Sequence, residues 1–345
     1  MGKTKRVFIS DIHLGSGKSY DWFQPQHEAN LLGLFESIVE EKDDIKDLVI
    51  LGDLFDTWVC PPDKTPPSIQ DIIAAHPKIF KGLSDCVAAL DNVFYINGNH
   101  DMHVSQEDIE GIRAGGKVMK RIERYHGGLL YAEHGHRFAM FNARDKLHDR
   151  DGLPVGYFIS RMIAGKQGYT HPRALFSYVD DLLEASFTSR TFTSSVVEAI
   201  MEWAGHHLDT AFVMPRGRNK LSIREVIEKY ATLFERWTQK FGYRYAIQSI
   251  RAELGSMGWF ADRLCKRNGY QVVIMGHSHV SETDHDRGSW LLSTNNRIYA
   301  NSGYWCTPSP TFVEVDKTST GFEVDLYRMK NGIPEHVENQ NIGRW

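Results

Sequence analysis

The chain has 345 residues, 41% of them hydrophobic and 24% charged, which is ordinary for a globular protein of one large domain with an insertion or of two domains. Its net charge of −4 disfavours a broad nucleic-acid-binding face, and four cysteines without paired spacing disfavour structural zinc and a disulfide framework. The sequence shows neither the ~18 consecutive apolar residues of a membrane span nor a secretory leader, so we expect a cytoplasmic protein without a transmembrane segment.

Strands and helices alternate through the first hundred residues. The pattern predicts strands at 6–10, 47–53 and 92–100, separated by helices at 26–42 and near 69–90. Repeated units of this kind predict an α/β fold with a largely parallel sheet at its centre.

A different pattern follows two short strands near 117–124 and 129–134. From about 148 to 252 the sequence is helical and amphipathic, and Ser195 and Ser222 each begin a capping-box sequence that predicts a helix start. After Ser222, apolar residues recur at helical spacing along one stripe: Ile223, Val226, Ile227, Tyr230, Phe234 and Trp237. We therefore predict a helical insertion, a cap or lid, over 148–252.

The α/β pattern resumes after the insertion. A helix is predicted near 256–268 and a strand at 271–275, and the end of the chain is rich in strands with a hairpin turn at 317–321. Residues 1–147 and 253–345 are thus predicted to form one α/β domain that the insertion interrupts.

Residues 10–19, SDIHLGSGKS, allow two interpretations. GSGKS is like the end of a phosphate-binding P-loop, but that motif needs a glycine five positions before Gly17, where Ile12 stands. The glycine-rich part is therefore interpreted as a polar loop. Directly before it, Asp11 and His13 follow a strand two residues apart, so a carboxylate and an imidazole point to one side, as in a metal site.

Four further polar clusters lie at or just beyond predicted strand ends. They are GDLFD at 52–56, GNHD at 98–101, EHGH at 133–136 and GHSH at 276–279. Loops after strands are where α/β proteins place their chemistry, although any one cluster is also explained as an ordinary turn. Five clusters at successive strand ends, all offering Asp, Asn or His, indicate a shared site.

The side-chain types in these clusters indicate metal chemistry. Carboxylate, amide oxygen and imidazole suit manganese, iron or zinc, and no thiolate is among them. Two ions roughly 3.5–4 Å apart need a bridging group such as a carboxylate, and such pairs act on phosphates by clamping the attacking and leaving oxygens. We expect two divalent metal ions, manganese first, with iron or zinc as alternatives.

Together the blocks DxH, GDxxD, GNHD, a lone His and GHxH resemble the calcineurin-like metallophosphoesterase family over residues 11–279. The resemblance implies a four-layer αββα sandwich of two mixed sheets, with the helical insertion added to a catalytic domain of residues 1–147 and 253–345. It implies hydrolysis of a phosphomonoester or phosphodiester by attack of a metal-bridging hydroxide. The implied ligands form two sets that share one carboxylate: Asp11, His13, Asp53 and His279, and Asp53, Asn99, His134 and His277.

Proton transfer has separate candidates. The resemblance implies His100 as the general acid or transition-state stabiliser and Asp56 as the carboxylate that orients it, with Asp101 as a competitor for that role. A carboxylate keeps an imidazole cationic, and the cation can protonate a leaving alkoxide. His136 is expected either to contact the bound phosphate or to support a ligand, and His103 to be an exposed loop residue.

The sequence indicates a substrate class but not one substrate. FISDIHLGS, LGDLFDTW and the insertion resemble the UDP-2,3-diacylglucosamine hydrolases, which cut a pyrophosphate, but His100 stands where those enzymes commonly carry Arg. A small phosphorylated substrate, monoester or diester, is the broader expectation. A nuclease is disfavoured by the acidic charge, and a non-catalytic scaffold is disfavoured because no ligand is missing. The sequence predicts no oligomeric state.

The start of the insertion is basic. Residues 137–173 contain three aspartates and seven basic residues. The basic residues are Arg137, Arg144, Lys146, Arg150, Arg161, Lys166 and Arg173. Because this stretch directly follows His134, we expect Arg144 and Arg150 to bind substrate phosphate through bidentate guanidinium contacts. The alternative is a solvated helical face with ion pairs within the helix.

Overall fold

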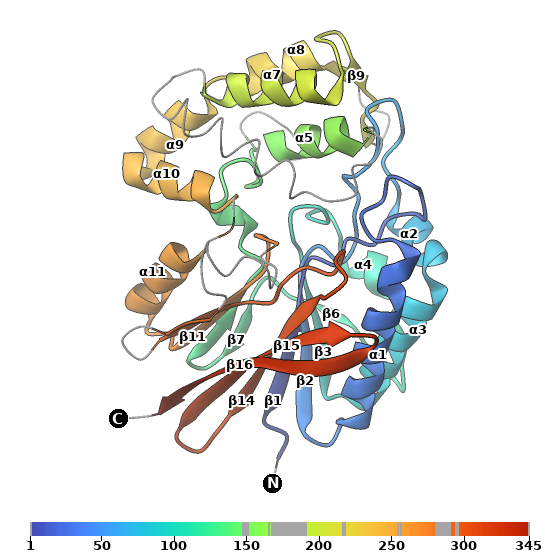
Figure 1. The fold of residues 1–345 in the computed structure, drawn as a ribbon, viewed down its shortest axis with the longest axis vertical. Coiled ribbons are helices and arrows are strands. Elements are labelled where there is room, and N and C mark those ends of the chain that lie inside the picture. The colour runs from blue at the N-terminus through green and yellow to red at the C-terminus, as the bar shows by residue number, and fades with distance from the viewer. Residues whose placement is uncertain are drawn as a thin grey trace.

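The computed structural model describes residues 2–146, 152–164, 166, 192–215, 219–253, 255, 257–279, 291–293 and 297–343. Two sheets form the lower part of the molecule in Figure 1, and the helices of the insertion lie above them. The N-terminus lies at the far end of the sheets from the insertion, so the first strand runs toward the insertion (Figure 1).

The larger sheet has the strand order β16-β15-β14-β1-β2-β3-β6. Strands β1, β2, β3 and β6 run parallel, and the last three strands of the chain extend the sheet with antiparallel pairs. The strand bounds are Lys5–Ile9 (β1), Ile45–Leu51 (β2), Asn92–Ile96 (β3), Lys120–Arg121 (β6), Thr311–Lys317 (β14), Gly321–Lys330 (β15) and Ile333–Gly343 (β16). The predicted hairpin between β14 and β15 is confirmed.

The smaller sheet has the order β12-β13-β11-β8-β7. Its three central strands are parallel, and an antiparallel strand lies at each edge. The strand bounds are Tyr125–Gly127 (β7), Leu130–Ala132 (β8), Val272–Met275 (β11), Leu291–Ser293 (β12) and Ile298–Asn301 (β13). Both sheets are therefore mixed.

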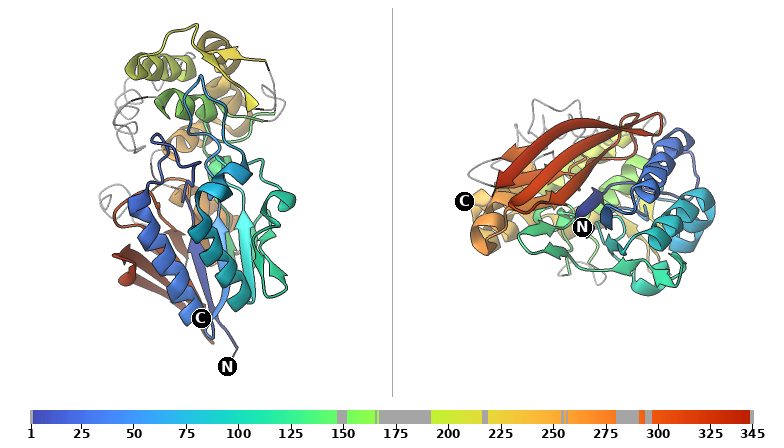
Figure 2. Two further views of the ribbon diagram at one scale, coloured as in Figure 1. Left: turned by 90° about the vertical axis from the view of Figure 1, so that its right-hand side faces the viewer. Right: turned by 90° about the horizontal axis from the view of Figure 1, so that it is seen from below.

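Helices cover the outer face of each sheet. Those of the sandwich are α1 (Glu28–Glu40), α2 (Ile69–Ala75), α3 (Pro77–Ala89), α4 (Gln106–Ile109) and α11 (Gly258–Asn268). Figure 2 shows α1 and α3 along one outer face of the larger sheet, and Figure 1 shows α11 on the opposite side of the molecule, beside the smaller sheet.

Alternation along the strands builds the layers, because successive side chains point to opposite faces of a sheet. Val7 and Ile50 pack in one apolar cluster with residues of α1 and α3. Phe8 and Val49 instead pack against the smaller sheet. On the far side of that sheet, Val273 joins a cluster with residues of α11. The four layers confirm the predicted αββα sandwich.

The insertion has an apolar cluster of its own. Its helices and short ribbon strands are α5 (Val155–Ala164), α7 (Phe192–Ala204), β9 (Ala211–Phe212), β10 (Leu221–Ser222), α8 (Ile223–Tyr230), α9 (Leu233–Phe241) and α10 (Tyr243–Arg251). The cluster also takes in Trp58, Met102, Met140 and Phe141, which come from sandwich loops. The division at residues 148 and 252 stays a prediction, and the packing shows that the two parts share apolar surface. No described helix is long and apolar enough to cross a membrane.

Three local predictions differ from the structure. The helix near 69–90 is two helices, because Pro77 opens α3 and its ring disfavours helical backbone at His76. Ser222 caps α8 as predicted, by accepting the N–H of Glu225, whereas Ser195 lies inside α7 and starts no helix. The stripe that begins at Ile223 spans two helices, since α8 ends at Tyr230.

Strand β16 is an element that the sequence did not predict. It contains Pro334 and many polar residues, and among the described strands it pairs with β15 alone, at the edge of the larger sheet. An edge strand tolerates proline and polar residues because one of its sides forms no ladder hydrogen bonds.

Candidate metal centre

The predicted ligands gather where parallel strands of both sheets end. Asp11 and His13 follow β1, and Asp53 follows β2. From the smaller sheet, His134 follows β8 and His277 follows β11. Because parallel strands end at one edge of a sheet, residues far apart in the sequence become neighbours here.

The backbone at this edge is strained. Five of the predicted ligands have positive φ angles although none is a glycine: Asp11 (54°), His13 (55°), Asp53 (53°), His277 (71°) and His279 (51°). A residue held in such a sparsely populated region costs about 1–3 kcal/mol, and such residues concentrate at functional sites. The sharp turns aim these side chains inward.

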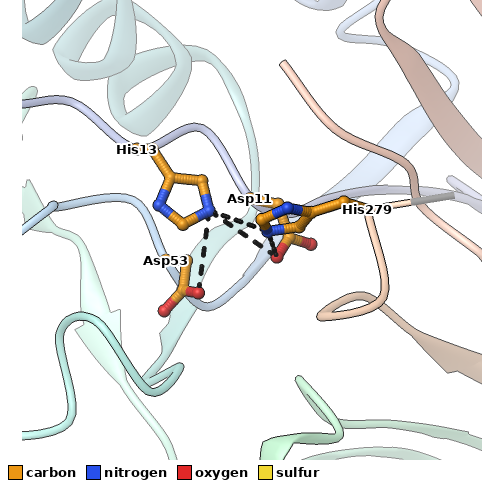
Figure 3. Close-up of side chains that lie close together, drawn as sticks. All are labelled: Asp11, His13, Asp53 and His279. Atoms are coloured by element: carbon orange, nitrogen blue, oxygen red, sulfur yellow. Dashed lines mark hydrogen bonds and ion pairs between the residues drawn. The ribbon is translucent and has the colours of Figure 1, made fainter. Parts of the chain in front are cut away.

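The first ligand set converges as predicted. Figure 3 shows Asp11, His13, Asp53 and His279 pointing toward one another, and their ligand atoms all lie within 4.8 Å of each other. Asp11 Oδ1 is 3.2 Å from His279 Nε2. His13 Nε2 is 3.0 Å from His279 Nε2 and 3.8 Å from Asp53 Oδ2.

The second set lies on the other side of Asp53. Asp53 Oδ2 is 3.3 Å from His134 Nε2. Asn99 Oδ1 lies 3.0 Å from both His134 Nε2 and His277 Nδ1. The same Asp53 oxygen therefore faces an imidazole of each set.

Unpaired buried atoms test whether these residues fit metal ions. Asp11 Oδ1, Asp53 Oδ2 and His277 Nε2 are buried without a hydrogen-bond partner. Such atoms are costly to bury, and a divalent cation would satisfy them. Burial acts to raise the pKa of Asp11, but the imidazoles of His134 and His279 outweigh it and bring that pKa down to about 2. The Asp11 carboxylate thus keeps its negative charge. The oxygen and nitrogen donors of the centre suit manganese, iron or zinc.

His100 lies next to the metal ligands with Asp56 beside it. Asp56 Oδ1 is 3.0 Å from His100 Nδ1, and Asp56 Oδ2 is 3.1 Å from His13 Nδ1. The backbone N–H groups of Trp58 and Val59 donate to Asp56 Oδ1 and fix the carboxylate. Burial acts to lower the pKa of His100, but the carboxylates of Asp56 and Asp53 outweigh it and raise that pKa.

Asp101, the competing partner for His100, has a different set of contacts. It accepts the backbone N–H groups of Leu54 at 2.9 Å and Gly98 at 2.6 Å, so it ties the GDLFD loop to the GNHD loop. Asp53 Oδ1 in turn accepts the backbone N–H of His100 at 2.8 Å. A Cβ on Gly98 would collide with the Asp53 side chain, which explains why a glycine stands there.

The basic residues at the start of the insertion have separate roles. Arg144 and His136 line a cavity beside His134, whereas Arg137 forms an ion pair with Glu133. Arg161 is fully buried, and its guanidinium group donates to backbone carbonyls and does not face a substrate site. Arg150, predicted to bind substrate, lies outside the described residues, as do Asp149, Asp151 and Arg173. His103 is exposed, as predicted.

Several residues at the centre were missed by the sequence analysis. Trp58 stacks on His100 with ring centroids 4.5 Å apart, and the ring of Trp22 lies 4.8 Å from that of His13. Trp58 lies two residues after Asp56 in the GDLFD block, but the sequence alone gives no sign of the stacking.

Two hydrogen-bonded pairs of residues, Glu253 with Asn142 and Ser10 with Ser302, support the predicted ligands from outside. Glu253 Oε2 is 3.7 Å from His277 Nε2 and accepts the side-chain amide of Asn142. Asn142 Oδ1 accepts the side-chain amide of Asn99 at 3.2 Å. Ser10, whose hydroxyl accepts that of Ser302 at 2.7 Å, donates to Asp11. Ser302 follows β13, so the strand-end signal that found the ligands also marks this position.

The solved structures similar to this chain include Vacuolar Protein Sorting 29 from Cryptosporidium parvum, with 11% identity, a TM-score of 0.38 and coverage of 100% of both chains. GAP50, the anchor in the inner membrane complex of Plasmodium, has 10% identity and a TM-score of 0.40, over 99% of this chain and 90% of that one. Vps29 from Entamoeba histolytica, in complex with zinc, has 10% identity and a TM-score of 0.34, over 97% of this chain and 98% of that one. None of the curated proteins compared matches the chain.

Family membership rests on the sequence itself. The sequence model of the family described as calcineurin-like phosphoesterase matches residues 4–281. That range contains all five motif blocks and every residue of the two ligand sets. The chain therefore belongs to the calcineurin-like phosphoesterase family.

Proposed function

We propose that the protein is a metal-dependent phosphoesterase that holds two divalent ions and hydrolyses a small phosphomonoester or phosphodiester. The observation that carries the proposal is the pair of buried carboxylate oxygens, Asp11 Oδ1 and Asp53 Oδ2, which have no hydrogen-bond partner and face imidazoles on both sides. A complete ligand set also supports an enzyme over a scaffold that keeps only the fold.

The chain's own residues hold and orient the reacting groups. Asp53 is assigned to both ions because its Oδ2 atom lies near His13 on one side and His134 on the other. Divalent ions bound there would supply an activated water and neutralise charge on the phosphoryl group. Manganese is the first expectation, with iron and zinc as alternatives.

His100 is assigned to donate a proton to the leaving oxygen. Its Nδ1 atom faces Asp56, so Nε2 is left to carry the proton to the substrate. Asp56 orients the ring and stabilises its cationic form. Trp58, stacked on the ring, holds it from the other side.

The insertion is assigned a role in binding the organic part of the substrate. A cavity of about 330 Å³ lies next to Trp58, between the proline-rich loop that includes Pro66 and the insertion residues Leu153, Tyr157 and Pro215. Its volume is that of a small-ligand pocket, and both parts of the chain contribute walls. The insertion would then act as a lid rather than as separate padding.

A panel of esters tests this function. The protein is stripped with a chelator, reloaded separately with manganese, iron, zinc or magnesium, and assayed on p-nitrophenyl phosphate, bis-p-nitrophenyl phosphate and a UDP-sugar pyrophosphate. Hydrolysis that depends on the added metal is expected for at least one ester. Folded protein that binds metal and cleaves none of them would support the scaffold alternative instead.

A further inference from the structure

A second cavity adjoins the metal centre on the side of His134. It has a volume of about 180 Å³, well above the ~10–15 Å³ that one water needs. Gly98, His134 and His136 form the wall that it shares with the centre. A ligand in this cavity would therefore lie next to a phosphate held at the metal centre.

Arginines dominate the rest of its wall. The cavity is lined by Arg121, Arg124, Arg137 and Arg144, with Glu123 and Glu133 as the only described carboxylates of its lining. Glu133 is fully engaged, because both its oxygens accept from Arg137, at 2.5 and 2.8 Å. Glu123 pairs with Arg121 at 3.2 Å and is itself largely exposed.

Two of these arginines, Arg124 and Arg144, differ from the other two in their described partners. Among the described residues, neither Arg124 nor Arg144 forms an ion pair with a carboxylate. Arg144 donates to the carbonyl of Met102, which fixes its guanidinium group without neutralising it. Burial and the nearby charge of Arg121 lower the pKa of Arg144. Like charges held together in this way are destabilising unless an anion joins them.

One buried atom points to the same conclusion. His136 Nδ1 is buried and has no hydrogen-bond partner, and the ring lies 5.4 Å from that of His134. His136 also lines the cavity. Buried polar atoms without a partner are rare, and this one belongs to a residue of the cavity wall.

We infer that this cavity binds a second phosphate group of the substrate, so that the substrate class is a phosphate ester whose organic part carries another phosphate. The inference rests on the proposed function, because the scissile phosphate is taken to lie at the metal centre. Arg124 and Arg144 provide charge-assisted hydrogen bonds to the second phosphate, and the positive charge of Arg121 attracts it further.

Matched pairs of substrates test the inference. Alkanediol bisphosphates of increasing chain length are compared with alkyl monophosphates of the same length, using manganese-loaded protein. We expect kcat/KM for the best bisphosphate to exceed that of its monophosphate by about 10- to 100-fold, the usual worth of a charged hydrogen bond. The preference should shrink in Arg144→Gln and in Arg124→Gln, and Arg144→Lys should retain part of it.

Lys120→Gln is the matched control, since Lys120 precedes Arg121 on β6 but donates to Asn92 and lines neither cavity. It removes one positive charge and should leave the preference intact. Equal use of both substrates by the wild type, or a preference that survives Arg144→Gln and Arg124→Gln, overturns the inference.

A binding measurement separates this inference from the proposed function. If no ester is cleaved, the affinity of the bisphosphates and monophosphates is measured by calorimetry on the same proteins. Tighter binding of bisphosphates that both arginine variants weaken supports the cavity assignment even without catalysis. Equal affinities for the two series would overturn it while leaving the hydrolysis assays to judge the function.

Discussion

The metal centre and the insertion bury their polar groups in opposite ways. In the insertion, the guanidinium group of Arg161 is fully buried and donates to the carbonyls of Pro61, Lys64 and Val213, among others. At the metal centre, Asp11 and Asp53 are equally buried, yet each has an oxygen without a partner.

The difference separates a structural charge from a functional one. Arg161 has its hydrogen bonds within the protein, and these bonds attach α5 to the proline-rich loop of the sandwich. One oxygen of each carboxylate, Asp11 Oδ1 and Asp53 Oδ2, lacks such a partner, as expected where a ligand from outside the protein binds. Burial and charge alone would have classed all three residues together.

The largest expected effect is at Asp53. Asp53→Asn removes the charge that faces both ligand sets, so both metal content and hydrolysis should fall, with affinity lost by more than the ~10–100-fold typical of groups one step away from a metal. Elemental analysis and turnover are measured together. Asp47→Asn, a buried carboxylate of β2 held by Tyr125 and Asn92, is the control and should keep both ions. A variant at Asp53 that retains two ions per chain would contradict the bridging assignment.

The next effect concerns His100. His100→Asn should keep both ions but lose about 10²–10⁴ in rate on an ester with a poor leaving group. The loss should be smaller for a nitrophenyl ester, whose leaving group needs little protonation. His126→Asn, an exposed histidine of β7, serves as the control. Equal losses on the two esters would count against proton donation.

The same residue predicts a pH dependence. Burial disfavours the His100 cation, but Asp56 and Asp53 outweigh it and raise its pKa above the usual value. The proton is present below that pKa, so the rate on the poor leaving group should fall as the pH rises through it. The pH profile of kcat/KM should lose this decline in His100→Asn. A decline that persists in the variant would assign it to another group.

A loss of stability is expected at Arg161. Arg161→Met leaves several buried carbonyls without donors, at about 1–3 kcal/mol for each unsatisfied group, and a net loss of about 3 kcal/mol in the free energy of unfolding is expected once some find water. Urea unfolding measures it. Arg224→Met, which breaks an exposed ion pair with Asp209 in the insertion, should cost under ~1 kcal/mol. Similar losses of unfolding free energy in both variants would mean that the buried hydrogen bonds of Arg161 stabilise the fold no more than an exposed ion pair does.

The smallest effect tests the insertion as a lid. Pro215→Trp should narrow the 330 Å³ cavity from the insertion side and raise KM for a bulky diester about 10-fold. A small aryl phosphate should be cleaved almost as before, and Pro215→Ala should change neither value. This substitution is preferable to removal of residues 150–250, which would expose Trp58 and Phe141. An unchanged KM for the diester would mean that the cavity does not receive the substrate.

The local features of the centre were readable from the sequence. Asp11, Asp53 and His277 each follow an apolar strand, and their residue types alone favour metal binding. Turn residues and strand periodicity are short-range signals, so most strands of the sandwich, the side chains that meet at the centre and the family resemblance could be predicted. The helix at 26–42 was predicted for the same reason, and the structure places α1 at Glu28–Glu40.

The tertiary structure decided which of several equivalent residues does what. Asp56 in the GDLFD block and Asp101 in the GNHD block are both candidates to orient His100. Only packing places Asp56 on the imidazole and Asp101 on backbone N–H groups. Likewise, Arg144 and Arg161 carry the same charge in one basic stretch, but one lines a cavity and the other is buried among carbonyls. These outcomes depend on contacts between segments far apart in the chain, which sequence periodicity does not encode.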